Sequence, residues 1–267
     1  MRQNERKMGL EAYRFRGYDR PFPSHFHPHY VLGLMEAGER ELTCGPGQYR
    51  LRAGDLLIFR PGECHGCTHA GEISMDYRGL NVPAELMEAQ GPLQVRTVVR
   101  DREAAERFRT LHQEVLDGGG GEGLDDLAAL LRERYPAPAV CAPEEGAVEA
   151  ACAYMAAHCA QRVGLEELCA LTGLSRAGLQ RSFRRCRGMS PYRYLENLRV
   201  IRAEELLRQG ADLAQAALEA GFSDQSHLTH YFGRFLGLPP GAYRGLARGG
   251  EGEKNGQPGE KMCDRFG

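Results

Sequence analysis

The sequence predicts an α+β protein of more than one domain, in which an N-terminal β-barrel with following helices precedes a C-terminal all-α domain with two helix-turn-helix units. Two observations predict this class. Short apolar segments separated by turns fill residues 13–82, and a helical motif occurs twice between residues 165 and 244. A chain of 267 residues also has the length of two ordinary domains.

The N-terminal region begins with a series of short strands. Some of these segments alternate between apolar and polar residues and others are apolar throughout, and turns rich in glycine and proline separate them. Several short strands at such spacing are typical of a small antiparallel barrel or jelly roll. The clearest strands are Tyr30–Met35, Arg40–Cys44, Gln48–Arg52 and Leu56–Phe59.

Two amphipathic helices are predicted after the strands. Asp101–Leu116 and Leu124–Tyr135 each carry an apolar stripe at helical spacing, and the glycine-rich residues 117–123 separate them. The stripes have two interpretations, because the helices either cover the barrel or form a dimer interface. We assign residues 1–135 to this N-terminal domain.

Residues 136–143 are predicted to be a linker, because three prolines in eight residues favour a stiff extended spacer over a helix. The helical domain then spans residues 144–248 and opens with an alanine-rich helix at Glu144–Cys159. Residues 249–267 are rich in glycine and charge and poor in apolar side chains, so we expect a disordered tail there.

The helical domain contains one motif twice. The pattern L-x3-F-x4-G-x2-P-x2-Y begins at Leu179 and begins again at Leu228, 49 residues later. Upstream of the two copies, Gly173 and Gly221 each stand where a short helix would end, and Ser175 is a good N-cap for the helix that follows. Helix, tight turn and helix make a helix-turn-helix unit, whose second helix lies in the major groove of DNA.

The helical domain is also more basic than the rest of the chain. Ser175–Arg202 contains eight arginines and one acidic residue, Glu196. Leu165–Arg248 holds 12 basic and 8 acidic residues, a net +4, whereas the remainder holds 22 and 28, a net −6. A basic module on an acidic chain indicates nucleic-acid binding. Pro191–Arg208 is the predicted helix that connects the two units.

These features carry a family resemblance. Leu165–Arg244 resembles the DNA-binding domain of AraC/XylS-type transcription regulators, which implies sequence-specific binding to double-stranded DNA. The resemblance and the helical periodicity give the candidate DNA contacts: Arg176, Ala177, Gln180, Arg181 and Arg184 in the first unit, and Gln225, Ser226, Thr229 and His230 in the second. We expect Gln180 to pair with adenine and Arg181 with guanine or a phosphate, while the second helix contributes less affinity.

The barrel sequence has a likeness of its own. Gly54, Asp55, Pro61, Gly62 and His65 resemble the second cupin motif, and the histidines of residues 25–29 resemble the first. The resemblance implies a cupin-like effector-binding domain. Its candidate effector contacts are His27, His29, Arg60 and His65. The sequence departs from the pattern twice, because no glutamate follows the histidines at the cupin ligand spacing and Arg60 stands where the motif has proline.

The missing glutamate leads us to expect an organic small-molecule effector, with neither a metal nor another cofactor in the barrel. Two alternatives stay open, because converging histidines hold divalent metals in catalytic cupins. One is a metal-dependent enzyme fused to a DNA-binding domain. The other is a metal- or redox-sensing regulator that uses Cys64 and Cys67, since a C-x2-C pair occurs in half zinc sites and redox pairs. Buried histidines and cysteines also occur without any ligand.

The favoured function is a regulator and not an enzyme. Its expected partners are double-stranded DNA and a small-molecule effector, the expected assembly is a homodimer, and RNA polymerase is a further candidate partner. The chain has nine cysteines, no signal sequence and no apolar run of the ~18 residues that span a bilayer. We therefore expect a cytoplasmic protein without a membrane partner.

Overall fold

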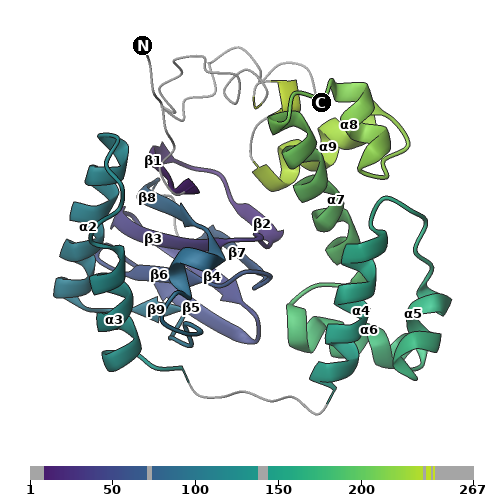
Figure 1. Ribbon diagram of the computed structural model, residues 1–267. Coiled ribbons are helices and arrows are strands. Elements are labelled where there is room, and N and C mark those ends of the chain that lie inside the picture. The colour runs from purple at the N-terminus through teal and green to yellow at the C-terminus, as the bar shows by residue number, and fades with distance from the viewer. Residues whose placement is uncertain (1–8, 71–73, 138–143, 237–238, 242, 244–267) are drawn as a thin grey trace.

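The computed structural model describes residues 9–70, 74–137, 144–236, 239–241 and 243, and it contains a β domain beside a helical domain (Figure 1). Most of the predicted linker, at 138–143, and the predicted tail, at 249–267, lie outside the described residues. Within the described ranges, no helix combines the length and the apolar character needed to cross a membrane.

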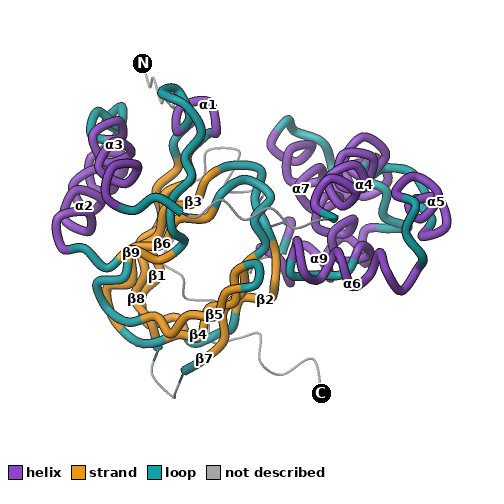
Figure 2. Tube along the Cα trace, turned by 90° about the horizontal axis from the view of Figure 1, so that it is seen from below, coloured by secondary structure: helices purple, strands orange, loops and turns teal. Residues whose placement is uncertain are grey.

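The β domain consists of two antiparallel sheets that curve around a common interior (Figure 2). One sheet has the order β1-β8-β3-β6-β9, and the other has the order β2-β7-β4-β5. The predicted strands are confirmed as β3, β4, β5 and β6. The bounds are β1 Glu11–Tyr18, β2 Phe22–His25, β3 Tyr30–Ala37, β4 Arg40–Cys44, β5 Gly47–Leu51, β6 Leu56–Phe59, β7 His65–His69, β8 Met75–Val82 and β9 Val98–Val99.

The Tyr30–Met35 part of β3 is apolar throughout because both of its faces are covered. Tyr30, Leu32 and Leu34 belong to the core between the sheet and the helices. Val31 and Met35 belong to the core inside the barrel. Side chains along a strand point alternately to opposite faces, so one continuous apolar segment serves two cores.

Helices α2 (Arg102–Leu116) and α3 (Leu124–Arg134) cover the outer face of the five-stranded sheet (Figures 1 and 2). Phe108 of α2 and Leu127 of α3 are fully buried in the same core as β3. Their apolar stripes therefore cover the barrel, as one of the two sequence interpretations expected. The short helix α1 (Ala84–Met87), which the sequence did not predict, packs beside α3.

The helical domain contains two packed groups of helices joined by one long helix. The first group is α4, α5 and α6, and the second is α8 and α9, while α7 contributes to both cores. The predicted connecting helix is confirmed as α7. The bounds are α4 Glu145–His158, α5 Leu165–Thr172, α6 Arg176–Arg187, α7 Pro191–Arg208, α8 Leu213–Glu219 and α9 Gln225–Leu236.

The repeated motif forms two equivalent cores, as the sequence predicted. Leu179 and Phe183 of α6 are fully buried, and so are Leu228 and Phe232 of α9. Gly173 ends α5 with a φ of +70°, in the left-handed region where glycine is unstrained. The fold class that the sequence predicted is therefore confirmed in both halves.

Candidate DNA-binding face and ligand-binding lumen

Helix α6 presents one polar face to solvent. Ser175 accepts a hydrogen bond from the backbone N–H of Gly178 at 3.1 Å, and this cap fixes where the helix begins. The predicted contact residues are all exposed: Arg176, Ala177, Gln180, Arg181 and Arg184. The Arg176 guanidinium forms an ion pair with Glu166 at the start of α5. The long polar side chains Gln180 and Arg181 lie in the middle of this face.

Helix α9 presents the matching face of the second unit. All four predicted contact residues are exposed: Gln225, Ser226, Thr229 and His230. The hydroxyl of Thr229 donates to the carbonyl oxygen of Gln225 at 2.8 Å, which occupies its only proton inside the helix. The second face therefore offers fewer strong donors than the first.

Several arginines of the basic segment stabilise the helical domain itself. Arg199 donates to the carbonyl oxygens of Cys159 and Gln161, at 2.8 and 2.9 Å, just beyond the C-terminal end of α4. Arg202 donates to the carbonyl oxygen of Glu219, the last residue of α8, at 2.7 Å. Positive charge is favourable at the C-terminal end of a helix. The count of eight arginines in the sequence thus overstates the charge available to DNA.

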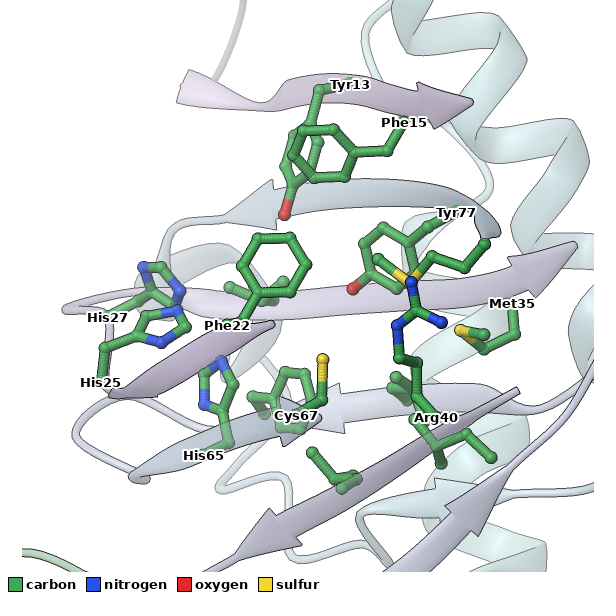
Figure 3. Close-up of a pocket in the computed structure, with 16 residues that line it drawn as sticks. Tyr13, Phe15, Phe22, His25, His27, Met35, Arg40, His65, Cys67 and Tyr77 are labelled. Atoms are coloured by element: carbon green, nitrogen blue, oxygen red, sulfur yellow. The ribbon is translucent and has the colours of Figure 1, made fainter. Parts of the chain in front are cut away.

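The interior of the barrel contains a lumen of about 80 Å³ (Figure 3). Aromatic and aliphatic side chains form most of its wall, and three histidines gather at one end, opposite Arg40. Arg40 is fully buried and donates to the carbonyl oxygens of Glu39 and Tyr18, at 2.9 and 2.6 Å. The labelled lining residues are Tyr13, Phe15, Phe22, His25, His27, Met35, Arg40, His65, Cys67 and Tyr77.

The three histidines come from β2, the loop after it, and β7. His25 and His65 lie directly opposite each other in the β2–β7 pair, and their ring centroids are 4.6 Å apart. The ring of His27 is 4.7 Å from that of His25 and 5.4 Å from that of His65. Burial lowers the pKa of all three imidazoles, and for His27 the neighbouring histidines lower the pKa further. The rings are therefore neutral at physiological pH.

The four predicted effector contacts do not share one site. His27 and His65 line the lumen, whereas His29 and Arg60 are absent from its wall within the described chain. Arg60 instead forms an ion pair with Glu63 at 3.0 Å and lines a second cavity of about 1520 Å³ between the two domains. The cupin pattern gave no signal for Arg40, whose strand looked like an ordinary alternating one.

Cys64 and Cys67 belong to different environments. Cys64 lies in the apolar cluster between the barrel and the helical domain, whereas Cys67 lines the lumen. Burial raises the pKa of the Cys64 thiol to about 12 and also raises that of Cys67. Both are free, neutral thiols, and the thiolate is the form that binds metal or attacks disulfides. The pair therefore does not form a common site.

Phe26 joins the barrel to the helical domain. This residue lies between His25 and His27 in the chain, yet its side chain is 4% exposed and belongs to the core of α4, α5, α6 and α7. Its ring stacks on Tyr194 of α7 with the centroids 4.5 Å apart. Its carbonyl oxygen accepts from the Nδ2 of Asn197 at 2.9 Å. The histidine end of the lumen thus contacts the connecting helix directly.

Each of the two domains matches a known protein family. Residues 7–133 match the family model for the AraC-like ligand-binding domain, and residues 168–245 match the model for a helix-turn-helix domain. The chain is 34% identical over 235 residues to the HTH-type transcriptional regulator YbfI of Bacillus subtilis. That alignment covers 82% of this chain and 86% of the relative. The chain belongs to the AraC family of transcription regulators.

Other AraC-family relatives agree along most of the chain. The HTH-type transcriptional activator RhaR of Klebsiella pneumoniae is 24% identical over 257 residues, with 85% of this chain and 89% of the relative covered. The crystal structure of ToxT from Vibrio cholerae has a TM-score of 0.62 and 14% identity, and covers 90% of this chain and 98% of its own. ToxT therefore shares the fold of both domains in the same order.

Proposed function

We propose that this AraC-family regulator binds specific DNA sequences through α6 and α9 and changes that binding when a small ligand occupies the barrel lumen. The observation that carries the proposal is Phe26, which connects the wall of the lumen to the helix that holds both helix-turn-helix units. The relatives are transcription regulators, which supports a regulatory and not a catalytic role.

The first unit provides most of the sequence readout in this proposal. Gln180 matches the donor and acceptor pair of adenine in the major groove, and Arg181 matches the two acceptors of guanine. Both side chains are exposed on α6. On α9, Ser226 and Thr229 have shorter uncharged side chains, so their contacts add less affinity.

The connecting helix sets the spacing of the two contacts. Helix α7 has 18 residues and spans about 27 Å at 1.5 Å per residue. With the width of the flanking units, this length suits two successive major grooves, which are ~34 Å apart on one side of the duplex. One protomer then recognises two short boxes about ten base pairs apart.

The signal passes from β2 to α7. A ligand at the histidine end of the lumen moves His25 or His27, and Phe26 between them transmits that movement to Tyr194 and Asn197. Helix α9 also lies beside β2, so the second DNA-contacting helix is close to the same strand. A homodimer would place two such pairs of helices on DNA, with RNA polymerase as a candidate further partner.

Selection of binding sites from random duplexes by the full-length protein tests the DNA half of this proposal. Enrichment of two boxes one helical turn apart is the expected result. The Arg181→Ala variant should lose preference at one base pair of the first box. The matched control is Arg102→Ala, which removes an exposed arginine from α2 of the barrel domain. Absence of any enriched sequence would contradict the proposal.

A further inference from the structure

The three lumen histidines have the arrangement of a metal-binding site. Each offers one ring nitrogen, and these nitrogens all lie within 4.8 Å of one another. Metal–nitrogen distances of 2.0–2.1 Å in a tetrahedral site bring ligand nitrogens about 3.4 Å apart. Binding an ion therefore requires the rings to rotate about their side-chain bonds and close that difference. No other group of three or more such side chains meets this distance among the described residues.

Backbone contacts orient two of the imidazoles for ligation. The Nδ1 of His25 is 2.7 Å from the carbonyl oxygen of Pro23, and the Nδ1 of His65 is 2.9 Å from that of Glu63. A carbonyl oxygen only accepts, so each Nδ1 carries the proton and donates it. Each Nε2 is then left with its lone pair. Histidine ligands of protein metals commonly donate their second ring nitrogen in this way.

The side chains around the three histidines restrict the rings and shield them from solvent. His65 is held against Phe59, whose ring lies parallel to it at a centroid distance of 3.7 Å. His25 and His65 are each 7% exposed, so bulk water has little access to their rings. Three histidines also suffice for a site that keeps an open position, so the missing cupin glutamate is not required.

The size of the lumen favours an ion over an ordinary organic ligand. Its volume of about 80 Å³ is well below the ~300–1000 Å³ of typical small-molecule sites. About 10–15 Å³ of such space holds one water. The lumen therefore has room for one metal ion with several waters, and a sugar-sized molecule would need the walls to move.

We propose that His25, His27 and His65 bind one divalent transition-metal ion, of the zinc, nickel, cobalt or ferrous class that imidazole prefers. The inference rests on the proposed function, because it identifies the class of ligand that the sensing barrel takes. Closing three nitrogens around an ion draws His25 and His27 together, and Phe26 between them shifts against Tyr194. The ion thereby alters the position of α7 and the DNA affinity.

Cobalt binding to the full-length, untagged protein tests the site. Visible absorption of the tetrahedral ion should saturate at one Co²⁺ per chain, and zinc should displace it. The His25→Asn and His65→Asn variants should each weaken binding at least 100-fold, above the 10–100-fold that loss of an outer contact costs. The matched control is His69→Asn at the exposed end of β7, which should bind like the wild type.

Two outcomes would overturn the inference: no saturable cobalt spectrum, or unchanged binding in the His25→Asn and His65→Asn variants. Circular dichroism of each variant distinguishes the loss of a metal-binding side chain from the loss of the folded structure. DNA binding by the same preparations is measured separately. If the protein binds specific DNA but no metal, the metal inference is refuted and the proposed function stands. If it binds metal but no specific DNA, the proposed function is refuted.

Discussion

Replacing Phe26 by alanine should release the helical domain from the barrel. The ring is 4% exposed and stacks on Tyr194, so its loss removes both buried apolar surface and an aromatic pair. Burying a phenylalanine contributes ~1.5–3 kcal/mol, and an aromatic pair adds ~0.5–1.5 kcal/mol. The free energy of docking should fall by about 2–4.5 kcal/mol, which lowers the ratio of docked to undocked chains about 30- to 2000-fold.

Small-angle X-ray scattering of the full-length protein measures this change. The Phe26→Ala variant should have a larger radius of gyration than the wild type, because a smaller fraction of its molecules keeps the two domains docked. The control is Phe15→Ala, which removes an aromatic ring from the wall of the lumen and should destabilise the barrel without undocking it. A Phe26→Ala scattering curve that coincides with the wild-type curve would refute the docking role of this residue.

Three further predictions address the DNA contacts and the repeated turn. In a fluorescence titration, Arg181→Ala should weaken binding to a selected site by ~1–3 kcal/mol, or about 5- to 150-fold. An equal loss of affinity for random DNA would show that Arg181 contacts a phosphate and not a base. Inserting five base pairs between the boxes turns the second box to the opposite side of the duplex, so footprints should lose its protection, and retained protection would contradict a rigid α7. Gly173→Ala should cost ~1–2 kcal/mol, the price of left-handed backbone in alanine, whereas Gly221→Ala should cost ~1–3 kcal/mol more. The added Cβ at Gly221 would lie 2.8 Å from the carbonyl oxygen of Cys159, whereas at Gly173 it meets nothing within 4 Å. Urea unfolding measures the free energy of unfolding of both variants. Equal losses of stability would contradict the steric argument.

The repeat made the helical domain predictable from the sequence. Leu179 and Phe183 are four residues apart and fall on one helical face, and Leu228 and Phe232 repeat that spacing. Local rules of this kind need no knowledge of distant residues. The connecting helix begins at Pro191, as predicted, because proline favours the first turn of a helix, and the structure shows Ser190 as its N-cap.

The lumen was less predictable, because its wall comes from strands far apart in the chain. The cupin-like pattern indicated His27 and His65 but also selected Arg60, whose side chain turns to Glu63 and to the cavity between the domains. Arg40 lies at a buried position of β4 that alternation would assign to an apolar residue. Which face of a strand becomes the inside of a barrel depends on how the sheets close.

The sequence by itself determined the fold class, the repeated helix-turn-helix core and the exposed polar faces of α6 and α9, because helix periodicity and capping act within a few residues. Only the tertiary structure decided that His25 meets His65 across two strands and that Phe26, between two lumen histidines, is buried in the other domain. These contacts join residues 40 and about 170 positions apart. Such pairs form because the sheets and helices bury their apolar faces together, and that packing depends on the whole chain.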